Sequence, residues 1–435
     1  MSTELTPDKK FSPEEFWNAR PLLRRVLLVA SRTRKSAYSI LGWLMVEMLT
    51  RIRYETCYVS EVGKASLNML FLMSAPTGGG KSASRRVALQ YFEFEGTNWS
   101  ASPPIQLGSG EAGADSYWVP TKNEDGRTEW VWVNPNHCRV FYNDEIAFHK
   151  GKAHQNSSTL EATYLSMYSG DHLGRSLAGG KGKEVPANEY RAVVVFNAQP
   201  ENDPFRNDAS KASGMPSRLL NLSAINPNAR ADYEATASQD IASMRKFLIP
   251  KVGHNGDVFV PPQYYALPEM EAAHAEEDFM AAEGLREHGR SHTLLTRAKV
   301  ACVLAALDGR ERLILEDWHL AGHLSDHSNA LDESIQRTIA LAQRSEAGKS
   351  GAILGVKMDA ADTSKEQAAI ERVAKNLRRH ASEAGYMLDK PASNPENITA
   401  SKKLATLITS RDRDHISPAL SLIYNELVNA QKEGK

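Results

Sequence analysis

The sequence has few cysteines and no long hydrophobic run. Its three cysteines, Cys57, Cys138 and Cys302, lie far apart without metal-ligand spacing, so neither a disulfide framework nor a cysteine zinc site is expected. We predict that they are buried free thiols in a reducing cytosol. No apolar stretch reaches the roughly 18 residues of a membrane span, and residues 1–10 lack the apolar part of a signal peptide. The sequence therefore predicts a cytoplasmic protein with no membrane partner.

An excess of charge of one sign is missing as well. The 52 Lys and Arg residues balance 53 Asp and Glu residues, which leaves a net charge of −1. No global basic field marks a nucleic-acid-binding protein, although a ring-shaped protein can confine positive charge to a channel. The hydrophobic content of 41% and the length of 435 residues predict a globular protein with a large core and about three domains.

The most informative motif is present at residues 75–82, between an apolar run at 70–73 and a helix-compatible run at 83–92. The motif runs Ala75-Pro76-Thr77-Gly78-Gly79-Gly80-Lys81-Ser82, with alanine where the first glycine is usual. Consecutive glycines let backbone N–H groups converge on phosphate oxygens, and the following helix directs its positive end at the same anion. Lys81 is predicted to reach the β- and γ-phosphates and Ser82 to ligate Mg²⁺. We therefore predict ATP and Mg²⁺ as cofactors, because a chance Gly-rich turn would not need the flanking strand and helix.

A second motif lies about 60 residues further on, where an apolar strand at 140–142 ends in Asn143-Asp144-Glu145. A parallel sheet would bring this strand end beside the phosphate loop. Asp144 would then hold Mg²⁺ through water, and Glu145 would act as general base toward the attacking water. The alternative is an acidic pair that caps the next helix.

Two further polar residues follow in the order that ATP hydrolysis would need. The strand predicted at 192–196 ends in Asn197, which would orient the water or contact the γ-phosphate, unless Gln199 does so or Asn197 merely starts a turn. Arg218 follows about 20 residues later, at the spacing of an arginine finger that acts on a neighbouring subunit. The alternative for Arg218 is a surface ion pair.

The pattern along the chain predicts an α/β fold. Residues 11–55 are predicted to be helical, beginning with the capping box Ser12-Pro13-Glu14-Glu15. Strands and helices then alternate over residues 65–225, which predicts a three-layer domain with a largely parallel sheet. The strand candidates are 67–73, 140–142 and 192–196, and one short helix is expected within 226–262. Helices are expected over 264–345, a linker over 346–366, and two further helices, at 400–408 and 417–429, within 367–430. His319, His323 and His327 recur along one helix, where zinc would need further ligands and a polar helix face is the alternative.

With these residues in order, the chain resembles the AAA+ ATPases, in which a phosphate loop, an acidic strand end, an Asn-bearing strand, a trans-acting Arg and a helical lid follow one another. Ser217-Arg218-Leu219 is similar to the Ser-Arg-Phe element of minichromosome-maintenance helicases. Arg290 and Arg297, seven residues apart, resemble the paired lid arginines of that group. The resemblance implies that one of the two contacts the phosphates of the nucleotide.

A closer resemblance is to the helicase-like portion of replication proteins from phages, plasmids and integrated elements of actinobacteria, over residues 12–340. The segments that carry it are 65–68, 108–111, 199–201, 307–310 and 316–318. Those proteins often include a primase-polymerase domain, which this chain lacks, so a separate primase or replication initiator is an expected partner. The implied location is the cytoplasm of a bacterial host.

The pattern along the chain and the resemblance together predict five parts. These are an N-terminal helical collar (1–60), an AAA+ ATPase core (61–230), a helical lid (231–345), the linker (346–366) and a C-terminal helical module (367–435) of winged-helix or helix-turn-helix type. The collar is expected to mediate subunit contacts, because helices outside the core need a partner for their apolar face. The C-terminal module contains several lysines and arginines and would bind DNA or a partner protein.

Two hairpins are predicted to contact single-stranded DNA, although each could be a solvated surface hairpin. One spans 174–185, where Arg175, Lys181 and Lys183 would meet phosphates. The other spans 117–133, with a turn at Asp125-Gly126 and with Lys122 and Arg127 near its tip.

The sequence as a whole therefore predicts an ATP-driven replicative DNA helicase of a mobile genetic element, which forms a homo-hexameric ring and translocates on single-stranded DNA. The alternatives are an AAA+ remodeller or loader and an origin-binding initiator ATPase, neither of which unwinds DNA. Fold alone does not decide among them.

Overall fold

The structure is a computed structural model, and it describes residues 9–100, 104–132, 138–143, 148–174, 183–236, 244–255, 258–285, 292–384, 388 and 414–433. The chain divides into two compact units, Met1–Ala340 and Leu341–Lys435. No helix in the described ranges combines the length and the apolar character that crossing a membrane requires. The three cysteines are buried and free, as predicted.

A four-stranded parallel sheet forms the centre of the first unit, in the order β7-β8-β3-β9. Its strands are β3 (Met69–Ser74), β7 (Cys138–Asn143), β8 (Arg191–Ala198) and β9 (Leu219–Ser223). The strand predictions at 67–73, 140–142 and 192–196 are confirmed to within two residues at each end. These runs are apolar almost throughout because both faces of the sheet are covered.

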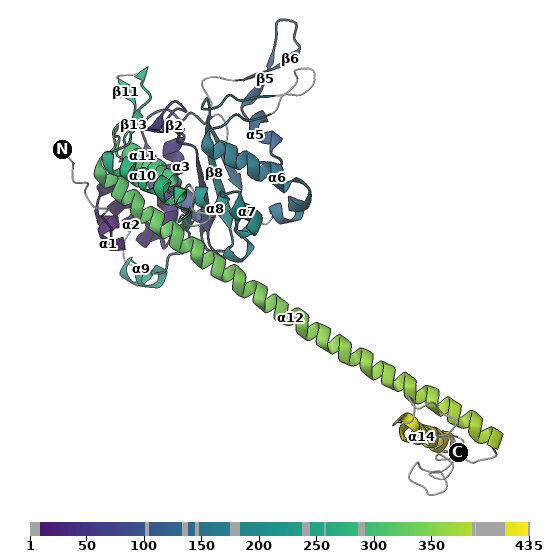
Figure 1. The fold of residues 1–435 in the computed structure, drawn as a ribbon. Coiled ribbons are helices and arrows are strands. Elements are labelled where there is room, and N and C mark those ends of the chain that lie inside the picture. Colours follow the sequence, from purple (N-terminus) through teal and green to yellow (C-terminus); the bar gives the residue numbers. More distant parts are fainter. Residues whose placement is uncertain are drawn as a thin grey trace. The chain divides into compact units, whose positions relative to one another are not determined.

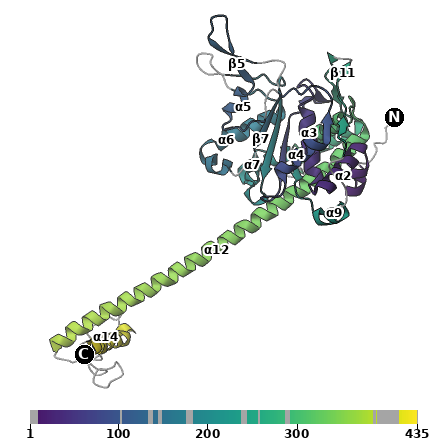
Figure 2. The same ribbon diagram turned by 180° about the vertical axis from the view of Figure 1, so that it is seen from behind.

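Helices cover the sheet on both faces (Figure 1, Figure 2). Those of the first unit are α1 (Pro13–Asn18), α2 (Pro21–Thr33), α3 (Ala37–Leu49), α4 (Lys81–Tyr91), α5 (Glu111–Asp115), α6 (Phe148–Ser169), α7 (Asp208–Ala212), α8 (Met215–Arg218), α9 (Ala229–Thr236), α10 (Pro268–Ala282) and α11 (Thr293–Leu307), with short 3-10 helices η1 (Pro200–Asn202) and η2 (Pro204–Arg206). Helix α12 (Leu315–Ala384) begins in the first unit and ends in the second.

Alternate residues of β3 enter two different cores. Met69, Phe71 and Met73 pack with α1 to α4 and α11, whereas Leu70 and Leu72 pack with α6 on the opposite face. This alternation is the two-residue period of a strand that is buried on both sides. The first unit is therefore a mixed α/β fold with a parallel sheet between helical layers, as predicted.

Smaller sheets surround this centre. One contains β13 (Gln263–Tyr265), β1 (Cys57–Ser60) and β2 (Gly63–Ser66), and the others are the pairs β4 (Phe92–Phe94) with β10 (Phe247–Ile249), β11 (His254–Asn255) with β12 (Val258–Phe259), and β5 (Trp118–Lys122) with β6 (Thr128–Trp132). The stretch before α10 thus holds several short strands in addition to the one short helix that was predicted there.

The N-terminal helices form as predicted, but their apolar faces are already covered. The capping box is confirmed, because Glu15 N donates to Ser12 Oγ (3.3 Å) and Ser12 N donates to Glu15 Oε2 (2.8 Å). Apart from the exposed Leu27 and Leu28 of α2, helices α2 and α3 bury their large apolar residues in the same core as β3 and α11. Most of these faces are therefore covered within the chain itself, and subunit contacts through the N-terminal helices stay a prediction. The predicted collar, core and lid share one hydrophobic core.

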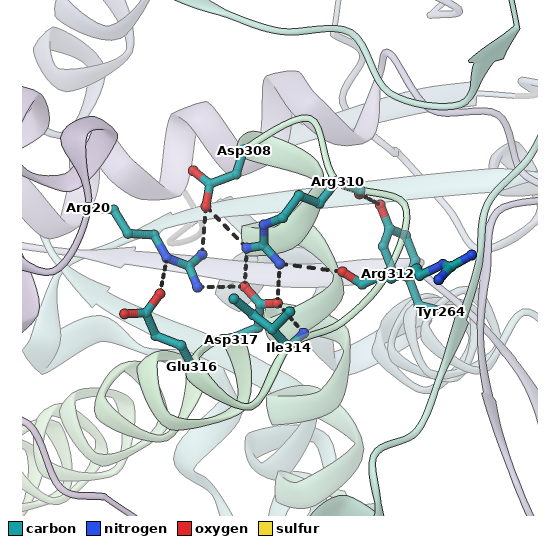
Figure 3. Close-up of polar contacts among 8 residues, drawn as sticks. All are labelled: Arg20, Tyr264, Asp308, Arg310, Arg312, Ile314, Glu316 and Asp317. Carbon is teal, nitrogen blue, oxygen red and sulfur yellow. Dashed lines mark hydrogen bonds and ion pairs between the residues drawn. The ribbon is translucent and has the colours of Figure 1, made fainter.

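A network of ion pairs ties the start of α2 to the α11–α12 junction (Figure 3). Arg20, whose side chain is 7% exposed, pairs with Asp308 (2.9 Å), Glu316 (2.9 Å) and the fully buried Asp317 (2.8 Å). Arg310 also pairs with Asp317 (2.6 Å) and Asp308 (3.1 Å). Asp317 further accepts a hydrogen bond from Ile314 N, so it caps the first turn of α12. Every buried charge in the network therefore has an opposite partner, as burial requires.

In the second unit, α12 meets α14 (Ile416–Glu433) through a small apolar cluster. The cluster contains Val373, Ala374, Leu377 and Ala381 of α12 with Ala419, Leu420 and Ile423 of α14. The helix predicted at 417–429 is confirmed, whereas the one predicted at 400–408 lies outside the described residues. Residues 346–366, which were predicted to be a linker, are helical within α12. The segment contains three glycines but no proline, and glycine weakens a helix by only ~1 kcal/mol per residue.

The histidines of α12 pack against aromatic rings. His323 stacks on Phe16, with ring centroids 4.3 Å apart. Its Nε2 accepts a hydrogen bond from the Tyr38 hydroxyl (3.0 Å), and its Nδ1 donates one to Phe11 O (3.0 Å). His327 stacks on Tyr38 at 3.6 Å, and its Nε2 accepts a hydrogen bond from Ser223 N (3.4 Å) at the edge of β9. Within the described ranges, no cluster of three potential metal ligands occurs. These two histidines therefore join α12 to α1, α3 and β9, and they do not form the polar face that was the alternative.

His327 gives the fold a pH dependence. Burial, followed by the charge of His323, lowers the pKa of His327 to about 4, against an unfolded value of about 6.5. The folded chain therefore binds fewer protons than the unfolded chain between these values, and stability that is complete above about pH 6.5 falls as the pH falls toward 4. We expect His327→Gln to reduce the change in the free energy of urea unfolding between about pH 5 and 6.5, by up to the order of 2 kcal/mol. The same slope in both proteins would contradict this.

Candidate functional site

The loop at 75–80 joins the carboxyl end of β3 to the start of α4. Gly78 and Gly80 have positive φ values of 76° and 93°, a backbone conformation that favours glycine. Lys81 Nζ donates to the carbonyl oxygens of Ala75 (2.5 Å) and Pro76 (3.1 Å), so the lysine folds back over the loop. Thr77 and Gly78 are exposed. The predicted strand–loop–helix context is therefore present, with a cation over the loop and a helix N-terminus beneath it.

Close packing explains the alanine at position 75. Ala75 is fully buried, and a Cβ added to Gly79 would lie 2.5 Å from the Ala75 Cβ and 2.9 Å from Pro76 O. The loop therefore accommodates a methyl group at position 75 only because position 79 is glycine. The departure from the usual first glycine leaves the shape of the loop intact.

The loop leaves the sheet between two strand ends. Ser74 lies level with Ala198 of β8 and with Ser223 of β9. Ala75 N donates to Ala198 O (3.2 Å), and Ala224 N donates to Ser74 O (2.9 Å). In open parallel sheets, ligands bind in the crevice at this carboxyl edge. The loop is therefore positioned where an α/β sheet binds its ligand.

Asn197 lies at the same edge, on the strand next to the loop strand. It pairs level with Met73, and its Nδ2 donates to the Tyr142 hydroxyl (2.7 Å). Gln199 accepts a hydrogen bond from Asn202 Nδ2 (3.3 Å) within the turn of η1. Both residues therefore flank Ala198, whose carbonyl oxygen accepts a hydrogen bond from the first residue of the loop.

Strand β7, which precedes the predicted acidic pair, is not adjacent to the loop strand β3. Strand β8 lies between β7 and β3, and Asn143, at the end of β7, pairs level with Phe196. Asp144 and Glu145, which follow Asn143 in the sequence, lie outside the described residues.

Lys35 is a cation beside the loop that the motif analysis missed. The turn between α2 and α3 includes Arg34, which has a left-handed φ of 57°, and the next residue but one, Ser36, donates through Oγ to Ser223 O. This turn brings Lys35 to Gly80, where an added Cβ would lie 3.4 Å from Lys35 Cδ and 3.8 Å from its Nζ. No local motif marks Lys35, because its proximity depends on the packing of α2 and α3 against β9.

Arg218 lies at the opposite edge of the sheet from the loop of its own chain. It directly precedes β9, whose first residue pairs level with Leu70, so the strand separates it from the loop by on the order of 15 Å. Its Nη1 donates to the carbonyl oxygens of Ser213 and Gly214 (both 3.0 Å), and its guanidinium lies 5.8 Å from the Tyr168 ring centroid. Burial lowers the pKa of Arg218, while Tyr168 and Asp171 oppose that shift.

Arg297 is held close to Arg218 through the residues that precede them. Thr296 Oγ1 donates to Ser217 O (3.2 Å), which joins α11 to α8. The Arg297 guanidinium lies 3.6 Å from the Trp318 ring centroid and donates to Trp318 O (3.0 and 3.2 Å). It also lines a pocket with Ser217 and the first residues of β9. Arg290 lies outside the described residues.

The two predicted hairpins are confirmed as far as they are described. Strands β5 and β6 pair antiparallel around a turn in which Gly126 has a φ of 74°. Leu173 and Val185 form an antiparallel bridge at the base of the second hairpin, whereas Arg175 and Lys181 lie outside the described residues. Lys183 contacts the first hairpin, with Nζ 3.4 Å from the Trp130 ring centroid and 3.8 Å from Asp115 Oδ1. Lys122 and Arg127 are exposed at the tip, where Asn123 N donates to Arg127 O.

Compared with known protein families and with curated proteins, the chain matches no family model and no curated sequence.

The geometry predicts that two lysines, Lys81 and Lys35, hold an anionic ligand at the loop. Lys81→Ala should abolish binding of a fluorescent ATP analogue, because it removes the cation that folds over the loop. Lys35→Ala should weaken binding by about tenfold, the equivalent of ~1.4 kcal/mol. The matched control is Lys64→Ala, which removes an exposed lysine of β2 and should leave affinity unchanged. Wild-type affinity in Lys35→Ala would remove Lys35 from the site.

Proposed function

We propose that this chain is an AAA+ ATPase that works as a replicative DNA helicase of a mobile genetic element. The observation that carries the proposal is the glycine loop at the carboxyl end of β3, with Lys81 folded over it, Lys35 beside it and Asn197 on the adjacent strand. Backbone N–H groups, two lysines and a helix N-terminus are the groups that a polyphosphate needs. The sheet order and the buried strands support an ATP site at this edge.

The residues at the loop fit ATP with Mg²⁺. The Ser82 hydroxyl at the first turn of α4 and the Asp144 carboxylate that follows β7 are oxygen ligands of the kind Mg²⁺ prefers. When bound, Mg²⁺ would neutralise charge on the β- and γ-phosphates. Lys81 and Lys35 would bind the phosphates, Glu145 would take the proton of the attacking water, and Asn197 would orient that water.

The position of Arg218 supports an oligomer. A guanidinium at the amino edge of β9 does not reach the loop of its own chain, so a role in hydrolysis requires a neighbouring chain. Arg297, joined to it through Thr296 and Ser217, would contact the same neighbour's phosphates. A homo-hexameric ring would supply such a neighbour to every site. Single-stranded DNA would pass the hairpins that carry Lys122, Arg127, Lys183, Arg175 and Lys181. The proposed partner is a separate primase or replication initiator, and the proposed location is the cytoplasm of a bacterial host.

One observation favours the alternative of a remodeller, loader or initiator that does not unwind DNA. Between Lys122 and Glu129, the tip of the β5–β6 hairpin contains two cations and three carboxylates. Its net charge is therefore −1, which does not attract phosphates at long range.

Strand displacement on forked DNA with a 5′ or a 3′ tail tests the proposal, with Glu145→Gln as the control. We expect displacement that needs ATP, one tail polarity and an intact Glu145, since removing the general base should leave ATP bound but slowly hydrolysed. ATP turnover without displacement on either fork would favour the alternative. No turnover at all would overturn the ATPase assignment itself.

Arg218 should act on the neighbouring subunit. Arg218→Ala and Lys81→Ala should each abolish ATP turnover alone, whereas a mixture of the two should regain part of it. In the mixture, some sites combine an intact loop from one chain with an intact arginine from the next. Turnover is measured across mixing ratios, with each mutant mixed with itself as the control. Absence of recovery at every ratio would contradict action in trans.

A further inference from the structure

The β5–β6 hairpin presents one tryptophan beyond the core. The register pairs Trp118 with Trp132 and Pro120 with Trp130, and these four side chains share one face of the ribbon because side chains alternate along a strand. Trp118 and Trp132 pack against the core on the α6 side of the sheet. Trp130 lies further along the ribbon and is 47% exposed. Figure 1 shows the hairpin projecting from its neighbours.

The exposed indole is also the point where the two hairpins meet. Lys183, two residues before the bridge residue Val185, lies with Nζ 3.4 Å from the Trp130 ring centroid. The backbone of Lys183 in turn lies close to Gly174, where an added Cβ would be 2.1 Å from Lys183 O. An aromatic ring of the projecting β5–β6 ribbon and a cation of the neighbouring hairpin thus lie together.

We propose that Trp130 stacks against a base of single-stranded DNA, with Lys183 binding an adjacent phosphate. This inference rests on the proposed function, and it adds a residue that contacts the base itself by stacking. An aromatic platform next to a cation is the combination that holds single strands without sequence preference, and stacking contributes about 1–3 kcal/mol per base. Because the hairpin tip has a net charge of −1, stacking, and not long-range attraction, provides the affinity there.

The test measures binding of the full-length chain to an oligodeoxythymidine and to an abasic strand of the same length. Trp130→Ala should weaken binding to the oligodeoxythymidine by roughly tenfold. It should leave the salt dependence of binding unchanged, because no phosphate contact is lost. Binding to the abasic strand should not change, since that strand has no base to stack. Trp130→Phe should keep most of the affinity.

The matched control is Thr121→Ala, which alters an exposed residue on the opposite face of the same hairpin and should change neither affinity. The far-UV circular dichroism spectrum of Trp130→Ala should equal that of the wild type, which verifies the fold. An equal loss on both strands, or no loss on either, would overturn the stacking role while the ATPase proposal stands. A wild-type chain that binds neither strand would overturn both the stacking role and the helicase. Binding with the predicted losses but without strand displacement would retain Trp130 and reject the helicase.

Discussion

The parallel pairing of β3 with β8 on one side and β9 on the other is the constraint on which the candidate site depends. It fixes Ser74 level with Ala198 and Ser223, so the loop leaves the sheet between two strand ends. It also fixes what surrounds the loop, because Asn197 comes with β8, and Lys35 comes with the turn that Ser36 ties to Ser223. A shift of one residue in this register would turn every side chain of β3 to the wrong face, since the two cores take alternate residues.

Polar contacts between helices and the edges of the central sheet stabilise this strand arrangement. The Arg20–Asp317 network fixes where α12 starts, and α12 then supplies Ser328 and His327 to the outward N–H groups of Asn221 and Ser223, which protects the edge of β9. At the amino edge, Asn68 accepts from Ala192 N and donates to Met167 O, while the buried Lys299 donates to Asn68 O. Burial and nearby positive charges lower the pKa of Lys299. Segments 65–68, 307–310 and 316–318, on which the sequence resemblance rests, therefore include residues with structural roles.

The sequence predicts those elements that local rules determine. The capping box at Ser12, the glycine-rich loop between a strand and a helix, the Asp125-Gly126 turn and the apolar strands follow from spacing and backbone preference within a few residues, and each is found. What it misses depends on contacts between distant segments. Lys35 lies 40 residues before Ala75, where the loop begins, and the apolar faces of α2 and α3 pack against β3 and α11. The helix through 346–366 was missed for another reason, since its glycines weaken a helix without ending it.

The separation of the loop from Arg218 also constrains the chemistry. The described contacts of the Arg218 guanidinium are two backbone carbonyls and an aromatic ring, which are weaker partners for a cation than an anion is. The lowered pKa of Arg218 reflects the same incomplete compensation of a partly buried charge. A phosphate brought to this edge by a neighbouring chain would replace neutral acceptors with charged ones, so exchanging the carbonyls for the phosphate would be favourable. In the proposed oligomer, each chain would therefore hold its arginine ready in neutral contacts, and assembly with a bound nucleotide would supply the negative charge that completes the site.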